Sequence, residues 1–218
     1  MVQNKKLLIA ASTLGELSGA KKIKETNNAD ILITGVGAFF SIYNLTKLLN
    51  QKHYDLALFF GICGLYDFNE DLLEVYSVET TRFLNLGIED DDGNFVPLSK
   101  TNFVENGYLN YNNGCFFNPS AKLLNKKTVT CNTVTQCKTE KKYVTQMLKK
   151  FPAQIETMES AAFSMVCLNE NQKFLEIRCA SNYVKPKKEQ KWRIKSAIEK
   201  LGEEIDYLLS SNILDSIC

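Results

Sequence analysis

The chain has 218 residues, of which 44% are hydrophobic, and this is enough for one sizeable core. Its 26 Lys and Arg nearly cancel its 25 Asp and Glu, so the formal net charge is +1. A near-neutral chain has no broad electrostatic field that would attract nucleic acid or a membrane surface. We therefore expect a single domain over residues 1–218 that binds a small neutral or amphiphilic partner.

The N-terminal stretch MVQNKKLLIAAST combines two lysines with a short apolar run. That run is about half as long as the apolar core of a signal peptide, so it predicts a first buried strand instead. Charged or polar residues interrupt every apolar run before it reaches the roughly 20 residues of a membrane span. We expect no contact with a membrane.

Cysteine usage points to the compartment. The seven cysteines form no C-x-x-C pair and stand at positions 63, 115, 131, 137, 167, 179 and 218. An odd number of scattered cysteines, several of them in predicted strands, is typical of a reducing environment rather than of a disulfide scaffold. The sequence therefore predicts a cytoplasmic protein.

Three apolar runs open the chain, at 6–12, 29–37 and 54–64. They are near-continuously hydrophobic, which is typical of strands covered on both faces. The segment 38–51 has apolar residues at helical spacing and predicts a helix between the second and third strands. The chain thus begins as a strand, helix and strand unit with parallel strands.

A further strand is predicted at 74–81, and the stretches 85–100 and 105–119 are rich in Gly, Asn, Asp and Pro, which indicates loops. Loop aromatics are candidates for binding or a subunit contact: Phe95, Tyr108, Phe116 and Phe117. Regular structure is predicted again as a strand at 128–134, a helix at 139–151, a strand at 173–181 and a helix from about 189 to 210. The pattern predicts an α/β fold with a central mixed, twisted sheet flanked by helices.

Several familiar sites are disfavoured. The only histidine, His53, falls at a predicted helix-to-strand turn, so we expect neither a catalytic triad nor a histidine metal site. The acidic run 89–94 lacks the alternation and distant glutamate of a calcium loop and predicts a solvated turn. The basic run 185–191 has no aromatic-studded basic face beside it and predicts a solvated connection rather than a nucleic-acid contact.

The motif Gly35-Val36-Gly37 follows a predicted strand. Phe40 stands where a dinucleotide fingerprint has its third glycine, and no Gly-Lys-Ser of a phosphate loop follows. Two interpretations stay open. The glycines either make a tight turn from strand to helix, or they let the backbone approach a ligand.

The stretch IETMESAAF (155–163) predicts a strand running into a helix of small residues, with Glu159 in the first helical turn. The carboxylate either offsets the helix dipole, by about 0.3–1 kcal/mol, or is delivered to the sheet edge where α/β folds bind small ligands. Two other predicted strand ends carry polar groups, Glu16 after the first strand and Asn182 after the strand at 173–181. With the neighbouring glycines they predict a small-residue cradle ringed by hydrogen-bonding groups.

These segments resemble the nucleoside phosphorylase and nucleosidase superfamily. The matching motifs occur in family order over nearly the whole chain: GVG (35–37), GICG (61–64), TMESAA (157–162) and IRCASN (177–182). Ser160 stands where the superfamily usually has glycine. Within the superfamily, IAASTLGE (9–16) and SNYVKPKKEQKW (181–192) are most similar to the futalosine hydrolase family.

The resemblance implies a purine nucleosidase that hydrolyses the N-glycosidic bond of futalosine and releases hypoxanthine in menaquinone biosynthesis. It implies no metal or organic cofactor, and a homodimer or higher homo-oligomer in which loop aromatics from 95 to 117 close a neighbour's cavity. Met158 and Glu159 would bind the ribose, and a negative charge there favours an oxocarbenium-like transition state. Glu16 would be the general base that activates water.

The resemblance also assigns the base. Asn182 would serve catalysis and base binding, the segment NTVTQ would supply further base contacts, and three residues would form a backbone cradle. The segment contributes Thr133, Val134, Thr135 and Gln136, and the cradle is Gly37, Cys63 and Gly64. Adenine-specific relatives carry Asp at the position of Asn182. An amide has both a donor and an acceptor, so Asn182 favours the O6 and N7 edge of a 6-oxopurine.

Alternatives stay open. Asn182 could merely cap a turn, and the protein could be a methylthioadenosine or adenosylhomocysteine nucleosidase that releases adenine. It could also be a nucleoside-binding protein that has lost turnover. Hydrolysis is favoured over phosphorolysis because the chain has only three arginines, Arg82, Arg178 and Arg193, and the first predicted strand is followed by TLGE without a basic loop.

Overall fold

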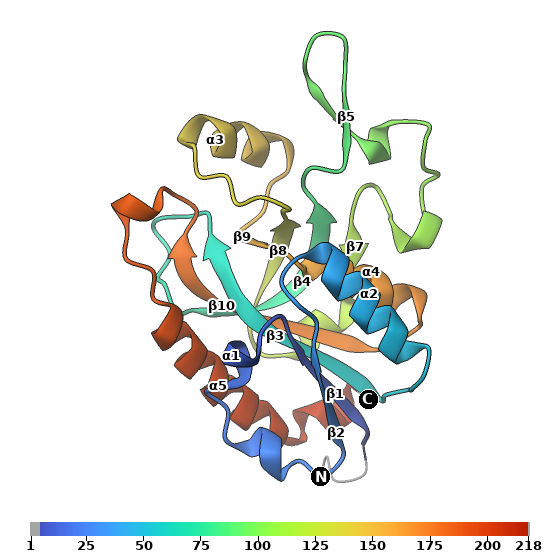
Figure 1. The fold of residues 1–218 in the computed structure, drawn as a ribbon, viewed down its shortest axis with the longest axis vertical. Coiled ribbons are helices and arrows are strands. Elements are labelled where there is room, and N and C mark those ends of the chain that lie inside the picture. Colours follow the sequence, from blue (N-terminus) through green and yellow to red (C-terminus); the bar gives the residue numbers. More distant parts are fainter. Residues whose placement is uncertain (1–4, 218) are drawn as a thin grey trace.

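The computed structural model describes residues 5–217 (Figure 1). Its strands are β1 (Leu7–Ala11), β2 (Ala29–Ile33), β3 (Leu56–Leu65), β4 (Val75–Phe83), β5 (Gly87–Glu89), β6 (Phe95–Pro97), β7 (Phe116–Phe117), β8 (Lys127–Thr133), β9 (Ile155–Thr157) and β10 (Phe174–Tyr183). Its α-helices are α1 (Leu14–Leu17), α2 (Ala38–Leu49), α3 (Lys141–Lys150), α4 (Ser160–Asn169) and α5 (Ile194–Ser210). The predicted α/β class is confirmed.

The main sheet is mixed. Among the described residues it runs in the order β10-β4-β8-β9-β3-β1-β2, with β7 added beside β4. Strand β1 pairs in parallel with β2 and β3, whereas β9 runs antiparallel to β3 and β10 antiparallel to β4. Because β3 also pairs with β10, the strands β3, β9, β8, β4 and β10 close into a ring. A core cluster drawn from all five fills it, including Cys63, Val78, Val129, Ile155 and Ala180.

The open part of the sheet lies between two layers of helices (Figure 1). Alternate residues of a strand face opposite sides of a sheet. Leu7 and Ile9 of β1 accordingly belong to a core with α5, whereas Leu8 belongs to a core with Leu45 of α2 and Phe163 of α4. Because helices pack on both faces of the sheet, the residues of β1 and β3 are almost all apolar.

Strand β10 is irregular near its end. Its register against β3 shifts between Ala180 and Asn182, where one extra residue of β10 opposes the step from Cys63 to Gly64. This is a β-bulge, which bends a strand and changes the face to which later side chains point. The polar end of β10 is therefore re-aimed relative to its buried beginning.

Some expectations need correction. The predicted second strand is not covered on both faces, because β2 lies at the edge of the sheet and Ile31 and Ile33 are exposed. The last helix begins at Ile194 rather than near residue 189. The side chain of Gln190 binds both the N–H and the C=O of Tyr183, which holds the preceding residues in a turn. Within the predicted loops, β5 and β6 pair as a hairpin and Phe116 is buried.

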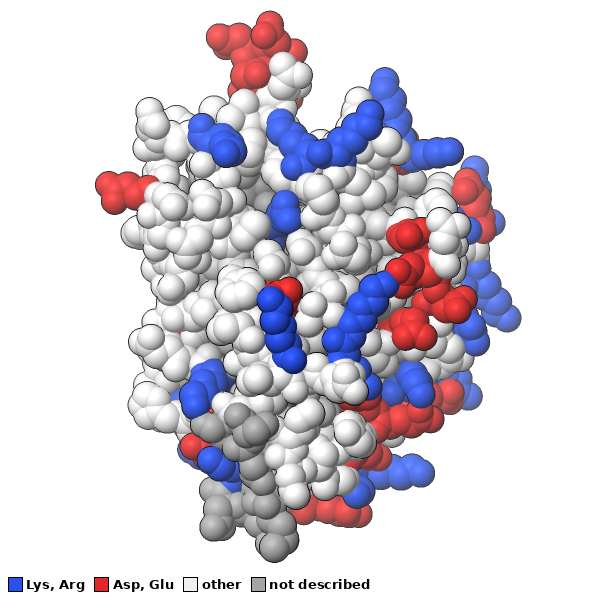
Figure 2. Space-filling model, turned by 180° about the vertical axis from the view of Figure 1, so that it is seen from behind, with Lys and Arg blue, Asp and Glu red and all other residues white. Residues whose placement is uncertain are grey.

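The surface carries charges of both signs. Figure 2 shows lysine and arginine side chains interspersed with acidic ones over one face, without a continuous basic field. His53 and the acidic residues 89–92 are exposed, as expected for solvated turns. No helix in the described part of the chain is long and apolar enough to cross a membrane.

Candidate active site

Part of the predicted site lies around one cavity of about 330 Å3. It opens where β1, β3 and β10 end and where β9 passes into α4. Six of the predicted residues line it: Glu16, Cys63, Gly64, Met158, Glu159 and Asn182. Segments remote in sequence thus converge on the edge of the sheet where α/β folds bind ligands.

Glu16 is held by a short helix. Its Oε2 accepts hydrogen bonds from the N–H of Thr13, at 2.9 Å, and from the Thr13 hydroxyl, at 3.1 Å. Its Oε1 accepts from the N–H of Ile62 at the end of β3, at 3.0 Å. The side chain is buried, and with both oxygens engaged the carboxylate is fixed in one orientation at the cavity wall. From the sequence this segment was expected to be a strand end, and α1 was not predicted.

Glu159 is the residue before α4, which begins at Ser160, so the expectation that it lies in the first helical turn is corrected. Its carboxylate does not cap its own helix. Oε1 accepts from the N–H of Gly37, at 2.8 Å, and Oε2 from the N–H of Met158, at 3.3 Å. Burial raises the pKa of Glu159, against the opposing charge of Arg178.

The glycine turn after β2 donates a backbone hydrogen bond to Glu159. Gly37 has a φ of +101°, which favours glycine, and its N–H points to the Glu159 carboxylate. Val36, rather than Gly37, lines the cavity. Of the two interpretations of this motif, the structure favours a turn that supports the site through Glu159.

Arg178 is a buried residue for which the sequence predicted no role in the site. Its side chain has no exposure to solvent, and its guanidinium lies over the ring of Phe59 at 4.3 Å. A Cβ on Gly61 would lie 2.0 Å from Arg178 Nη1 and 2.8 Å from Glu16 Oε1. The guanidinium and the Glu16 carboxylate therefore meet over Gly61, which only a residue without a side chain allows.

A buried network orients Arg178. Nε donates to Oε1 of Glu176 at 2.7 Å, whereas Nη1 and Nη2 have no hydrogen-bond partner among the described residues. The Ser160 hydroxyl donates to the same Glu176 oxygen and lies 2.6 Å from the hydroxyl of Thr157. Burial opposes the charge of Arg178, but the carboxylates of Glu176, Glu159 and Glu16 outweigh it and raise the pKa. Ser160, at the position where the resemblance implies glycine, thus takes part in this network through its hydroxyl.

Asn182 lies at the other end of β10. The Ser181 hydroxyl donates to its Oδ1 at 2.8 Å, and its Nδ2 donates to the carbonyl of Tyr183 at 3.0 Å. Glu156, which no motif singled out, lines the same cavity and accepts from the hydroxyl of Tyr66 at 2.9 Å. Burial raises the pKa of Glu156 to about 7, although bonds from Tyr66 and Cys137 oppose this.

The segment predicted to bind the base is placed differently from the expectation. The structure puts residues 133–136 outside the cavity lining, which at this loop consists of Cys137 and Thr139. Thr133 accepts from the N–H of Ala161, and Val134 donates to the carbonyl of Thr157. These bonds hold the start of the segment to β9 and α4, so the chain reaches the cavity a few residues later.

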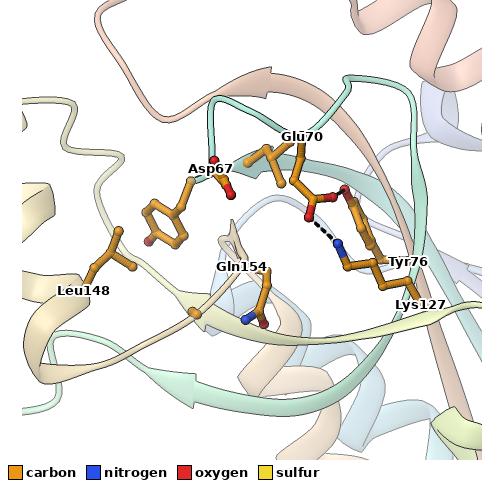
Figure 3. Close-up of a pocket in the computed structure, with 9 residues that line it drawn as sticks. Asp67, Glu70, Tyr76, Lys127, Leu148 and Gln154 are labelled. Carbon is orange, nitrogen blue, oxygen red and sulfur yellow. Dashed lines mark hydrogen bonds and ion pairs between the residues drawn. The ribbon is translucent and has the colours of Figure 1, made fainter.

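A second cavity, of about 390 Å3, contains none of the predicted site residues (Figure 3). In it Glu70 points toward Lys127 and Tyr76, forming an ion pair with the lysine and a 3.5 Å hydrogen bond with the phenol. Asp67 and Gln154 also face it. The lysine in this lining is thus neutralised by Glu70.

Among the described residues, neither a disulfide nor a cluster of metal ligands marks a second candidate site. The six cysteines of the described chain are free, and the seventh, Cys218, lies outside the described residues. Within residues 5–217 no group of three His, Cys, Asp or Glu side chains is placed to hold a metal ion.

Comparison with known proteins gives a consistent result. No family model matches the chain. Futalosine hydrolase of Acidothermus cellulolyticus is 23% identical over 190 residues, covering 84% of this chain and 76% of that protein. Futalosine hydrolase of Thermus thermophilus is 26% identical over 184 residues, covering 82% of this chain and 80% of that protein.

Solved structures share the fold. A mutant of the Helicobacter pylori nucleosidase MTAN with 5'-methylthioadenosine in its active site has a TM-score of 0.71 at 15% identity, covering 95% of this chain and 99% of that chain. The 5'-methylthioadenosine/S-adenosylhomocysteine nucleosidase of Campylobacter jejuni has a TM-score of 0.74 at 13% identity, covering 98% and 100%. In sequence the chain resembles futalosine hydrolases, and its fold is that of the methylthioadenosine and adenosylhomocysteine nucleosidases.

Proposed function

We propose that this protein is a nucleosidase that hydrolyses the N-glycosidic bond of futalosine and releases hypoxanthine. The observation that carries the proposal is the convergence of Glu16, Glu159 and Asn182, from three distant segments, on one cavity. The resemblance to two futalosine hydrolases supports the substrate. The remaining lining is mainly apolar and includes Trp192, which suits the apolar parts of a nucleoside.

The ribose is assigned to Met158 and Glu159. The two carboxylate oxygens of Glu159 each accept one backbone hydrogen bond and keep further acceptor capacity for sugar hydroxyls. A buried negative charge beside the ring stabilises the positive charge that develops as the bond between C1′ and N9 breaks. This interaction strengthens in the transition state and therefore lowers the barrier.

The nucleophile is assigned to the place where Glu16 and Arg178 meet. Glu16 accepts a proton from water as the water oxygen forms its bond to C1′. The buried Nη groups of Arg178, which have no partner in the described chain, can donate to the same water and hold it in line. The base leaves with the electron pair of the broken bond and takes a proton from solvent, while the Asn182 amide binds its O6 and N7 edge.

Water suits this site better than phosphate. The cavity lining contains no lysine or arginine among the described residues. Arg82 donates to the carbonyl of Pro152, and Arg193 lies at the start of α5. Phosphorylases need cations that grip the phosphate, and only the buried guanidinium of Arg178 lies near.

A homodimer is part of the proposal, because apolar side chains beside the cavity are uncovered. Leu14 follows the cavity-lining Thr13 in the chain, and Phe39, Phe40 and Tyr43 follow the cavity-lining Val36; all four are exposed. A second copy seated on this apolar face would bury it and close the cavity. The loop aromatic Tyr108 is also exposed, as the predicted neighbour contact requires. We place the enzyme in the cytoplasm, as its cysteine usage predicts, and in menaquinone biosynthesis, as the resemblance implies.

The second candidate is an adenine-releasing nucleosidase, which the solved structures of the same fold favour. Asn182 distinguishes the two. If the protein reads a 6-oxopurine, Asn182→Asp should shift preference toward adenine nucleosides, because a carboxylate accepts from an exocyclic amine. If it already reads adenine through other groups, that variant gains nothing.

The test is to incubate the protein with futalosine or methylthioadenosine, with and without phosphate, and to identify the released base by chromatography. We expect hypoxanthine from futalosine at a rate that phosphate does not change. Adenine as the sole product would overturn the substrate, and an absolute need for phosphate would overturn hydrolysis. Binding of nucleoside without base release, unaffected by Glu16→Gln, would indicate a binding protein instead.

A further inference from the structure

Glu156 is a buried carboxyl in the cavity wall that the proposed mechanism does not use. It is the register partner of Gly64 across the antiparallel pair of β9 and β3. Asn182 is the register partner of the same glycine across the parallel pair of β10 and β3. Directly opposite residues on neighbouring strands project to the same face of a sheet. Glu156 and Asn182 therefore flank Gly64 on one face.

Gly64 leaves a gap between these two side chains. A Cβ at this position would lie 3.3 Å from Cγ of Glu156 and 3.5 Å from Nδ2 of Asn182. It would also lie 3.0 Å from Cγ2 of Val184. The missing methyl group gives a flat floor, bounded by a carboxyl group on one side and an amide on the other. A planar heterocycle resting there presents its polar edge to both.

After their hydrogen bonds within the protein, both side chains still have hydrogen-bonding groups available for a ligand. The Glu156 carboxyl accepts from the Tyr66 hydroxyl at Oε2 and from the Cys137 thiol. A carboxylate offers about four acceptor sites, so acceptor capacity remains for a ligand. Asn182 uses one proton of Nδ2 and one lone pair of Oδ1 on its neighbours, so one donor and one acceptor remain. No cation in the cavity lining pairs with Glu156, and burying an unpaired carboxyl is unfavourable for the fold alone.

A 6-oxopurine matches this set. Its edge presents N7 and O6 in succession and then the N1–H donor. In the free base with N7 protonated, the amide of Asn182 can donate to O6 and accept from N7–H, which leaves N1–H for the Glu156 carboxylate. Adenine has a lone pair at N1, which a carboxylate oxygen repels, so the same arrangement disfavours it.

We propose that Glu156 is a specificity-determining residue, whose carboxylate accepts a hydrogen bond from N1–H of a 6-oxopurine and rejects bases that lack this proton. The inference rests on the proposed function and extends it from Asn182 to a second reader of the base. It predicts that discrimination depends on N1 and not only on the substituent at C6. In Glu156→Gln, the amide can turn its oxygen to Tyr66 and present a donor to the cavity.

The test measures binding of free bases by calorimetry at about pH 8, where Glu156 with its pKa of about 7 is mostly ionised. The probes are hypoxanthine, 1-methylhypoxanthine and adenine. The wild-type protein should bind hypoxanthine about 10- to 100-fold more tightly than either other base, because each leaves the carboxylate without its partner. This comparison needs no variant. Equal binding of hypoxanthine and 1-methylhypoxanthine would overturn the inference.

Variants give a second measurement. In Glu156→Gln the preference for hypoxanthine over adenine should fall at least about tenfold. Glu89→Gln, the same exchange at an exposed position of the β5–β6 hairpin, should leave the preference unchanged. An unchanged preference in a folded Glu156→Gln protein would refute the role of Glu156. Hypoxanthine release from futalosine is scored separately, so the proposed function can stand when this inference fails. Failure of the wild-type protein to bind hypoxanthine would also overturn the inference, whereas the proposed function is decided by hypoxanthine release alone.

Discussion

Arg178 and Glu176 form an ion pair from which solvent is excluded: Nε lies 2.7 Å from Oε1 and neither side chain is exposed. The pair engages only one nitrogen of the guanidinium and leaves the Nη groups toward Glu16. A buried pair of this kind is weak support for stability in itself, since desolvation opposes the attraction. Its value here is positional, because it fixes the donors that face the proposed nucleophile.

Removing Glu176 should therefore impair both the fold and the reaction. In Glu176→Gln the guanidinium keeps its charge but loses its buried counter-charge, so we expect a loss of about 3–5 kcal/mol in the free energy of unfolding. The measurement is urea denaturation, together with kcat for base release on the fraction that remains folded. Glu199→Gln breaks the exposed contact with Lys195 and should change neither quantity measurably. Equal stability of the two variants would contradict the role assigned to the pair.

Glu16→Gln should abolish turnover while preserving the pocket. The amide oxygen can still accept from Thr13 or Ile62, so the side chain keeps its place but cannot take a proton. We expect kcat to fall by about 10²–10⁴-fold and the dissociation constant of the nucleoside to change little. Single-turnover kinetics and equilibrium binding separate these effects. A kcat within tenfold of wild type would remove Glu16 from the role of general base.

Glu156 should make stability depend on pH in a specific window. Its pKa rises on folding from 4.5 to about 7, so between these values the folded state holds a proton that the unfolded state has lost. Stability from this group is complete below about pH 4.5 and decreases as the pH rises toward 7. Relative to wild type, Glu156→Gln should thus gain up to about 3 kcal/mol between pH 4.5 and pH 8. Parallel stability curves of the two proteins in thermal or urea unfolding would contradict the shift.

Phe39 should govern assembly. It is 76% exposed on α2 near the cavity, and burial against a second copy would remove this apolar surface from water. Phe39→Asp should give a monomer in sedimentation experiments and raise the KM for the nucleoside, because the cavity loses a wall. Tyr207→Asp changes an exposed aromatic residue of α5 and should leave both unchanged. A monomeric wild-type protein would refute the proposed dimer.

The order of the main strands and helices could be predicted from the sequence because it depends on local patterns. Apolar runs and helical spacing lie within each segment, and Glu16, Glu159 and Asn182 stood out as polar groups at strand ends. The exposure of β2 could not be read in this way. It follows from the place of β2 at the sheet edge, which is a property of strand order and not of strand composition.

Which side chains lie together within the site could not be predicted from the sequence either. Glu156 and Asn182 meet only because β9 and β10 lie on either side of β3, and their common neighbour is one glycine. Arg178 was counted only as one of three arginines in the chain. Its place in an otherwise apolar strand could have indicated a buried cation, which requires a partner of opposite charge. Glu176, two residues before it, was the available signal.

The bulge near the end of β10 has a larger consequence. Arg178 and Asn182 are four residues apart and would share a face in a regular strand, but the extra residue turns Asn182 to the opposite face. In the proposed reaction, one strand thus supplies the guanidinium that faces the attacking water and the amide that binds the departing base. Deleting that single residue, Ser181, would return Asn182 to the face of Arg178 and separate the amide from the base, even with the carboxylates and the guanidinium still in place.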